Sequence, residues 1–304
     1  MHGVLLLDKP LGLSSNNALQ KCKWLLRAEK AGHTGTLDPL ATGVLPLCFG
    51  AATKFSQLHL EANKTYEATL RLGVTTTTGD AEGDVVATRP VEVSAEQILA
   101  VQQRFTGPIR QIPPMHSALK KDGKALYEYA REGIEVDRQP RDVVIHALEL
   151  TPALADTAYP ALKIVASVSK GTYIRTLGED IGAALGCGGH LVALRRISTG
   201  NFAETQCVTL PALEAMNEEQ RLACLLPVES LLAGHTRVTL DADHAGRFLS
   251  GLRRRGRWPD AGQVEVFGTQ PAALLGTAHV AGGELIPGRL LSPIEIQQIL
   301  EAKS

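Results

Sequence analysis

The stretch that most constrains the fold of this chain is the glycine-punctuated segment at residues 32–43, GHTGTLDPLATG. Its three glycines permit backbone turns that a side chain would block, and Pro39 fixes the chain directly after Asp38. Threonines at three further positions place short hydroxyl donors around that acid. Two interpretations stay open from these residues alone: a tight turn capped by Asp38, or a loop that aims its carboxylate into an active site.

Length and charge bound the class of protein. With 304 residues the chain exceeds the usual size of one domain, so a large domain plus a small one is expected. Lysine and arginine number 31 against 32 acids, so any polyanionic partner must be met by local patches. Five widely spaced cysteines without a Cys-x-x-Cys pair indicate reduced thiols. No signal peptide and no apolar run of membrane length is present, which predicts a soluble cytoplasmic protein.

Apolar periodicity predicts the first elements. Short apolar runs at residues 4–7 and 44–49 fit buried strands, and residues 14–16 offer N-caps for a helix. One face of that helix carries apolar side chains at helical spacing: Leu19, Cys22, Leu25 and Leu26. The other face carries cations: Lys21, Lys23, Arg27 and Lys30. A solvated face and a phosphate-contacting face both explain those cations.

Patterns further along the chain predict alternating strands and capped helices. Alternation predicts strands over residues 65–72 and 161–169. Helices are expected from about Lys54, from Ser94 to Phe105, and over residues 176–185, with Arg175 just before the last of these. From about Thr236, strand-like pieces and glycine-rich turns surround one capped helix at 241–249, which predicts a small β-rich domain.

Two basic stretches suggest contacts with RNA. Residues 111–136 are irregular and basic, and they include a short helix near 125–131 with two tyrosines, a mixture that suits looped RNA. A plain surface excursion explains this segment equally well. Four arginines lie close together in the β-rich part, at 253, 254, 255 and 257, where an RNA contact and a solvated loop both fit.

Other sites known from sequence motifs are excluded. An EF-hand starting at Asp80 would need glycine at Val85 and glutamate at Val91. Residues 187–190 resemble half a zinc site without a second ligand pair. Nucleotide fingerprints, phosphate loops and nucleophile elbows are absent from the sequence. Asp38 therefore remains as the candidate reactive group, and Arg175 stands where a guanidinium could hold a carboxylate.

Several separate motifs together carry a family resemblance. The segment 32–43, together with Tyr66, residues 169–176 and residues 194–196, closely resembles the bacterial TruB-type tRNA pseudouridine-55 synthases. The similarity runs from about Val4 to Thr209. It implies an α+β pseudouridine synthase fold with a mixed, mainly antiparallel central sheet. The implied domains are a catalytic domain over 1–235, with an RNA-clamping insertion at about 111–136, and a small PUA-like RNA-binding domain over 236–304.

The resemblance also implies an activity. The family isomerises uridine 55 in the T-loop of tRNA to pseudouridine without cofactor or metal. The implied partner is the T-arm of tRNA, with no membrane and no obligate protein partner, and a monomer is expected. Asp38 matches the nucleophile, which attacks either C1′ of the sugar or C6 of the base, and both routes stay open. Covalent catalysis needs this acid ionised, and Arg175 matches its cationic partner.

Further positions match residues of the family's binding pocket. Tyr66 matches an aromatic residue beside the target base, placed to stack on it and to assist proton transfer at C5. The target base must be flipped out of its loop at a cost of a few kcal/mol, and His33 matches the side chain that fills the vacated space. A histidine satisfied within the core is the alternative for His33. The other matches are pocket walls at Tyr173 and Leu194, a floor residue at Lys9, and an acid that can bond Arg175 at Asp80.

Three other functions compete with this interpretation. The chain could be a pseudouridine synthase for another RNA, an RNA-folding helper whose acid is dispensable, or an RNA-binding module with inert motifs. The intact set of Asp38, Tyr66 and Arg175 disfavours the last of these. Thr36 stands where many relatives have alanine, a position with no identified catalytic role.

Overall fold

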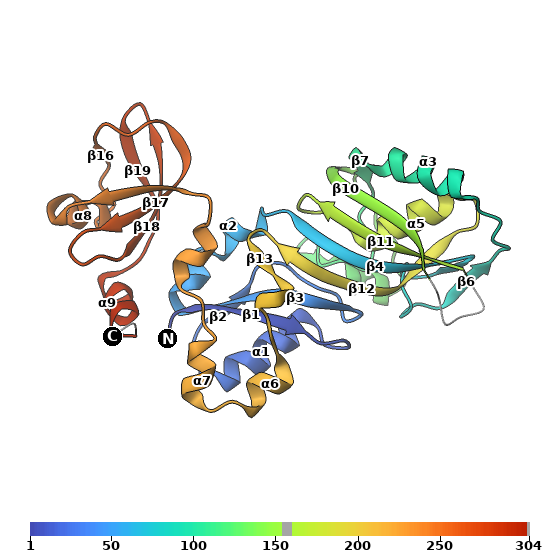
Figure 1. Ribbon diagram of the computed structural model, residues 1–304, viewed down its shortest axis with the longest axis horizontal. Helices are drawn as coiled ribbons and strands as arrows, with labels where there is room; N and C mark the ends of the chain where they lie inside the picture. The colour runs from blue at the N-terminus through green and yellow to red at the C-terminus, as the bar shows by residue number, and fades with distance from the viewer. Residues whose placement is uncertain (154–159, 303–304) are drawn as a thin grey trace.

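The structure is a computed structural model that describes residues 1–153 and 160–302. A ten-stranded mixed sheet forms the centre of the larger domain (Figure 1). Along its main path the strands follow the order β14-β1-β3-β12-β4-β11-β10-β7, with β2 beside β3 and β13 beside β12. Their bounds are β14 Val208–Thr209, β1 Gly3–Lys9, β3 Ala41–Phe49, β12 Gly189–Thr199, β4 Lys64–Leu72, β11 Ala161–Val168, β10 Arg141–Ala153, β7 Gly107–Gln111, β2 Ala31–His33 and β13 Phe202–Ala203.

The strand pairings confirm the predicted fold class. Within the described ranges, β1 pairs with β14 and β3 with β12 in parallel, and the other pairings of this sheet are antiparallel. The sheet is therefore mixed and mainly antiparallel, as expected. Strands β7 and β10 were missing from the sequence prediction. Both have many exposed residues, and β7 includes Pro108, so neither shows a clear apolar alternation.

Helices cover one face of the sheet and enclose the first core with it. They are α1 (Ser15–Leu25), α3 (Ala95–Phe105), α5 (Ile174–Ala184) and α6 (Leu210–Ala215). The predicted caps are confirmed, because the side chains of Ser14 and Ser94 accept from backbone N–H groups of their helices. The predicted start of α5 is wrong: the helix begins at Ile174, so Arg175 lies in its first turn. The predicted helix from about Lys54 is present as the short α2 (Ser56–Leu60), and a 3-10 turn, η1 (Gly50–Lys54), precedes it.

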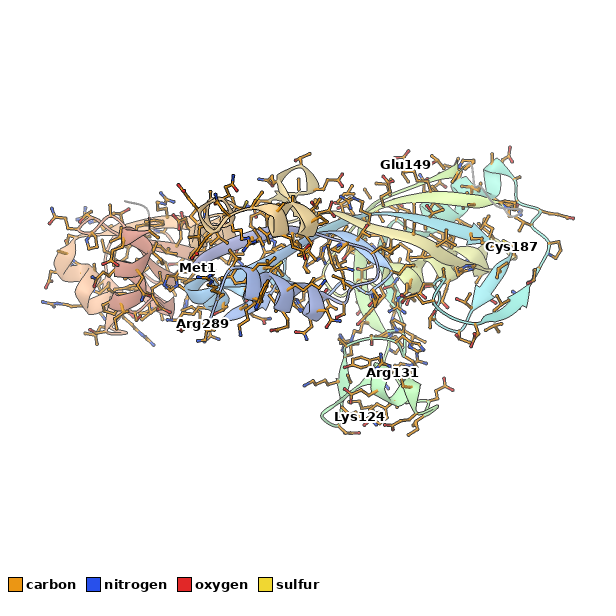
Figure 2. All side chains as sticks on the ribbon, turned by 90° about the horizontal axis from the view of Figure 1, so that it is seen from below. Met1, Lys124, Arg131, Glu149, Cys187 and Arg289 are labelled. Carbon is orange, nitrogen blue, oxygen red and sulfur yellow. The ribbon has the colours of Figure 1, made fainter. Side chains whose placement is uncertain are left out.

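Two excursions leave the sheet. The first is the hairpin of β5 (Val74–Thr76) and β6 (Val85–Thr88). The second is the predicted insertion, with β8 (Lys120–Lys121), β9 (Lys124–Ala125) and α4 (Leu126–Arg131), which projects away from the body of the molecule (Figure 2). Cation–π contacts hold it together, with the Lys124 ammonium 4.6 Å from the Tyr129 ring centre and the Arg131 guanidinium 5.2 Å from that of Tyr127. The RNA-clamping role of this insertion stays a prediction.

The C-terminal part has its own small sheet, in the order β15-β17-β18-β19-β16. Its elements are β15 (Thr236–Leu240), α8 (Ala242–Leu249), β16 (Arg254–Arg255), β17 (Ala261–Gly268), β18 (Leu274–Ala281), β19 (Glu284–Leu290) and α9 (Pro293–Glu301). They follow β14 through α6, α7 (Glu218–Ala223) and η3 (Val228–Leu232). The predicted domain limits, 1–235 and 236–304, stay a prediction, and residues 303 and 304 lie outside the described ranges.

The second core joins this small sheet to the back of the larger one. Val4, Val44 and Phe55 from the first domain belong to the same buried cluster as Val238 and Phe248 from the second. Across the described part of the chain, no helix is both long and apolar enough to cross a bilayer.

Candidate active site

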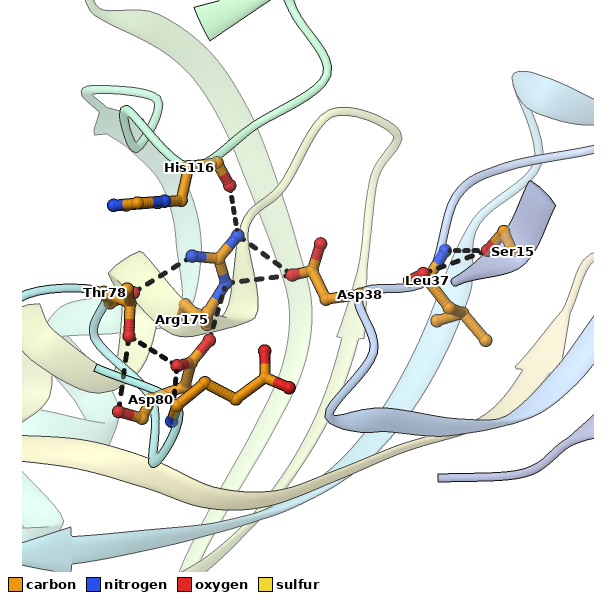
Figure 3. A network of polar contacts seen from close by, with 8 residues as sticks. Ser15, Leu37, Asp38, Thr78, Asp80, His116 and Arg175 are labelled. Atoms are coloured by element: carbon orange, nitrogen blue, oxygen red, sulfur yellow. Dashed lines mark hydrogen bonds and ion pairs between the residues drawn. The ribbon is translucent and has the colours of Figure 1, made fainter. Parts of the chain in front are cut away.

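Asp38 lies in the loop that connects β2 to β3, and its side chain is 38% exposed. The residue before it is held from α1: the backbone N–H of Leu37 donates to Ser15 Oγ at 2.7 Å, and that hydroxyl donates to the Leu37 carbonyl at 3.0 Å (Figure 3). After it, the Ala41 N–H donates to the Asp38 carbonyl at 3.0 Å. The loop is therefore fixed on both sides of the carboxylate.

At two positions of the loop, the backbone conformation requires glycine. Gly43 has φ +97°, and a Cβ there would lie 2.2 Å from the Arg196 carbonyl oxygen, because β3 and β12 run side by side at this point. Gly35 has φ +121°, and its carbonyl accepts from Arg196 Nη2 at 3.3 Å. Arg196 is 1% exposed and also donates from Nε to the Val44 carbonyl at 2.7 Å. This buried guanidinium thus supports the underside of the loop.

Arg175 holds the Asp38 carboxylate. Its Nε and Nη2 both lie 2.9 Å from Asp38 Oδ2. The remaining donors are taken by backbone carbonyls, Nη1 at 3.0 Å from Thr78 O and Nη2 at 2.5 Å from His116 O (Figure 3). With its side chain only 5% exposed, the guanidinium is fixed in one orientation by groups from three separate loops or turns.

Asp80 forms a second, buried acid behind Arg175. Its Oδ2 lies 3.5 Å from Arg175 Nε, and its side chain is 4% exposed. The other oxygen accepts from Thr78 Oγ1 at 2.5 Å and from the Glu82 N–H at 3.1 Å. The predicted bond between Asp80 and Arg175 is thus present as an ion pair. Asp80 orients the guanidinium, while Asp38 alone of these two carboxylates is open to a ligand.

A cleft of ≈ 840 Å³ opens beside the carboxylate of Asp38. The predicted pocket residues that line it are His33, Tyr66, Asp80, Tyr173, Arg175 and Leu194. Tyr66 and Leu194 come from the neighbouring strands β4 and β12, and both are largely buried. His33 and Leu194, which are 161 residues apart in the sequence, thus line the same cleft.

Lys9, predicted on the floor of the pocket, lies below the cleft instead. It is fully buried, it does not line the cleft, and its Nζ donates to the carbonyls of Pro10 at 2.9 Å and Leu13 at 2.6 Å. A third carbonyl, that of Pro39, lies 3.5 Å away. Burial lowers the pKa of Lys9 to about 8, although Asp38 partly opposes the change. Lys9 therefore ties the loop before α1 to the loop of Asp38 from below.

His33 does not fit the alternative of a histidine satisfied in the core. It is partly exposed and lines the cleft, and its buried Nδ1 has no hydrogen-bond partner among the described residues. Burial lowers its pKa, and the Arg196 charge adds to that effect, so the ring is neutral at pH 7. A neutral ring at the cleft wall can enter a stacked or apolar space.

Several residues of the site were missed by sequence reasoning. Ser15 was identified only as a cap candidate, and the carbonyls of Thr78 and His116 belong to the backbone, which any residue could supply. Gln111 was placed only at the start of the insertion. Its side chain accepts from the Tyr173 N–H at 3.0 Å and donates to the Tyr173 carbonyl at 3.3 Å, which positions this wall residue. Nothing in the sequence marked Gln111, because its burial results from tertiary packing.

Two residues of the segment 187–190, which resembled half a zinc site, have structural roles. His190 Nδ1 lies 2.8 Å from the Val74 carbonyl oxygen, and Cys187 is buried in the first core. The described residues contain no group of three or more potential metal ligands.

Comparisons with known proteins agree with this geometry. Residues 23–174 match the profile of the TruB family pseudouridylate synthase (N terminal domain), and residues 175–233 match the tRNA pseudouridylate synthase B C-terminal domain. The chain is 66% identical over its whole length to a tRNA pseudouridine synthase B of Verminephrobacter eiseniae, of which it covers 92%. It is 58% identical over 96% of its length to that of Ralstonia nicotianae, of which it covers 94%.

Among solved structures, the chain is similar to one in the crystal structure of a Cbf5-Nop10-Gar1 complex. The TM-score is 0.71 at 26% identity, covering 97% of this chain and 86% of that one. A chain of the archaeal box H/ACA sRNP Nop10-Cbf5 complex matches with a TM-score of 0.69 at 25% identity, covering 96% and 86%. The predicted fold is thereby confirmed.

Proposed function

The chain belongs to the TruB family of pseudouridylate synthases, and from this premise we propose that it isomerises uridine 55 in the T-loop of tRNA to pseudouridine, with Asp38 as nucleophile. The observation that carries the proposal is the pairing of Asp38 with Arg175 at 2.9 Å beside a cleft of ≈ 840 Å³. The carboxylate is oriented by a fixed cation and is still 38% exposed. A nucleophile needs both properties.

The reaction breaks the bond between N1 of the base and C1′ of the ribose and forms a bond between C5 and C1′. Asp38 forms a transient covalent bond, to C1′ or to C6, while the base turns within the cleft. C5 then gives up its proton and N1 gains one, so atoms and charge balance without a cofactor. Tyr66 lines the same cleft as Asp38, and we propose that it stacks on the base and assists the proton transfer at C5.

The uridine reaches the cleft by leaving its loop. Flipping a base costs a few kcal/mol of stacking and pairing, which contacts in the pocket must offset. Tyr66, Tyr173 and Leu194 supply largely buried or half-buried walls for the flipped base. His33, with its neutral ring and unpaired Nδ1, is suited to the space that the base leaves.

The decisive experiment follows the hydrogen at C5. Unmodified tRNA labelled with tritium at uridine C5 is incubated with the native chain and with Asp38→Ala. We expect release by the native chain and none above background by the variant, which should still bind tRNA because the substitution leaves the other side chains that line the cleft in place. No release by either protein, or equal release by both, would overturn the proposed chemistry.

Two further measurements address the rival functions. Mapping the modified position separates uridine 55 from another RNA target. A strain that lacks the native protein but carries Asp38→Ala tests for a helper role, because a full growth benefit from the inactive variant would show a function independent of catalysis.

A further inference from the structure

The cationic face of α1 leads from the cleft to a second hollow. Ser14, Ser15 and Asn16 at the start of the helix line the cleft of Asp38. Asn16, Gln20 and Lys23 follow one another at spacings of four and three residues, which places them along one side of the helix, and Arg27 follows just past its C-terminal cap at Leu26. Gln20 Nε2 donates to Asn16 Oδ1 at 3.4 Å along this line. From Asn16 to Lys23 the stripe is about 10 Å long at 1.5 Å per residue.

The hollow at the far end of this stripe combines an aromatic ring with cations. It has a volume of ≈ 490 Å³, and Gln20, Lys23, Trp24, Arg27 and Arg221 are among its lining residues. Trp24 is 78% exposed, and the Arg27 side chain is 82% exposed. Arg221 forms the rigid base, since its Nη1 donates to the Leu25 carbonyl at 3.2 Å and its Nε to that of Leu213 at 2.9 Å.

The local charge favours a polyanion. Residues 21–30 contain four cations and one acid, Glu29, although the chain as a whole has a formal net charge of −1. Glu218 lies 3.5 Å from Arg27, but both side chains are exposed, so this pair is weak and exchangeable. A single exposed apolar side chain needs no explanation. An exposed tryptophan between cations, in a hollow of its own near the end of α1, has the chemistry of a site for an unpaired nucleotide.

We propose that Trp24, Lys23 and Arg27 form a second nucleotide-binding site, in which Trp24 stacks on an unpaired base of the same tRNA and the two cations contact its phosphates. This inference rests on the proposed tRNA substrate. The site contributes to binding and register and takes no part in the chemistry, because it lies the length of α1 away from Asp38. It assigns a function to Lys23 and Arg27, two of the cations for which a solvated helix face was the alternative. The predicted cationic face is wrong in part, because α1 ends at Leu25 and both Arg27 and Lys30 lie beyond it.

The first test is spectroscopic. The chain has two tryptophans, so Trp258→Phe leaves Trp24 as the sole tryptophan. Titration of this variant with unmodified tRNA is expected to quench its emission, whereas heparin, a polyanion without bases, leaves it nearly unchanged. Absence of quenching by tRNA, or equal quenching by heparin, would overturn the proposal.

The second test measures affinity and rate. Trp24→Ala is expected to raise the tRNA dissociation constant roughly 5- to 100-fold, while the single-turnover rate at saturating tRNA stays unchanged. Trp24→Phe should keep most of the affinity because it keeps a ring. Lys23→Gln and Arg27→Gln should each lower the slope of log K against log salt by about 1. Leu99→Ala, which removes an exposed apolar side chain from α3, is the matched control.

The outcomes separate the two proposals. An unchanged dissociation constant for Trp24→Ala, or an equal loss for Leu99→Ala, would overturn the second site even if the enzyme is active. Quenching of Trp24 by tRNA without tritium release would uphold this site and contradict the proposed chemistry at Asp38.

Discussion

At the scale of single residues, the charged side chains of the site are held in fixed orientations by their contacts. Arg175 makes contacts to Asp38, Thr78 and His116 that use its Nε and both terminal nitrogens. Asp80 adds a buried countercharge at 3.5 Å. The guanidinium therefore acts as a rigid bracket for the Asp38 carboxylate, because any rotation would break several bonds in a buried environment.

Arg175→Lys should separate charge from geometry. An ammonium keeps the positive charge but cannot reach all three partners at once, so Asp38 loses its fixed orientation. We expect kcat for tRNA to fall about 100-fold with little change in tRNA affinity, as a small misplacement of a reacting group does. Arg110→Lys, at an arginine whose side chain is 72% exposed on β7, is the control and should be close to native. Native kcat for Arg175→Lys would contradict the bracket role.

A buried histidine makes stability depend on pH. Burial lowers the pKa of His59 from 6.5 to about 4, although a bond to the Thr199 carbonyl opposes this change. Between these values the unfolded chain binds a proton that the folded chain does not, so acid favours unfolding. The free energy of unfolding should fall by about 1.4 kcal/mol per pH unit from this residue as pH drops from 6.5 toward 4.

Urea unfolding between pH 7 and pH 5 measures this effect. His33, His116 and His235 also have lowered pKa values because of burial, so they add to the total slope. The difference between the native chain and His59→Asn isolates one proton. His146→Asn, at an exposed position of β10, is the matched control for replacing a histidine without disturbing the core. An equal slope for His59→Asn and the native chain would show that His59 is not the group responsible.

At the scale of elements, the junction of β3 with β12 determines where the Asp38 loop ends. The parallel register places Gly43 opposite Arg196 and Ala41 opposite Leu194. One short ladder thus joins the Asp38 loop to the strand that supplies a pocket wall and the buried guanidinium beneath the loop. Catalytic position and strand packing are coupled at this junction.

Gly43→Ala tests this coupling. A Cβ at φ +97° would lie 2.2 Å from the Arg196 carbonyl oxygen, so the strands must separate. We expect a loss of roughly 2 to 5 kcal/mol in the free energy of unfolding, together with loss of tritium release.

Gly32→Ala provides the matched control in the same segment. Its backbone does not require glycine, and a Cβ there would have no atom within 4 Å. Its free energy of unfolding should stay within about 1 kcal/mol of native. Equal stability of the two variants would show that the contact with Arg196 does not constrain the loop.

At the scale of the whole molecule, the small C-terminal domain is attached through a buried core and polar contacts. Lys54 Nζ lies 2.6 Å from Glu295 Oε2 and donates to the Leu290 carbonyl at 3.1 Å. His2 Nε2 lies 2.7 Å from Gln298 Oε1, which joins the start of the chain to α9. A shared apolar cluster lies between these contacts. The two domains should therefore behave as one folding unit.

Calorimetry can test this unity. We expect one cooperative transition for the native chain, because separating the domains would expose part of a common core. Lys54→Met with Gln298→Ala should lower the transition temperature of the C-terminal part and resolve a second peak. Two separated peaks in the native chain would contradict the shared core.

The sequence by itself determined the local features. Glycine positions, helix caps and apolar alternation are properties of neighbouring residues, so Ser14 and Ser94 were placed correctly as caps, and strands β1, β3 and β4 were found where expected. Motifs spread along the chain were specific enough to indicate the family and the candidate acid. Edge strands such as β7 were missed because their pairing partners lie far along the chain.

Only the tertiary structure determined how these residues are arranged in space to form the candidate site. The carbonyls that hold Arg175 come from the backbone and leave no trace in residue identity. The placement of Arg175 in the first turn of α5, and of Lys9 below the floor of the cleft rather than on it, depends on packing between distant segments. Local propensity acts over a few residues, whereas the distance between Asp38 and Arg175 is set by a ten-stranded sheet that brings together positions 137 residues apart.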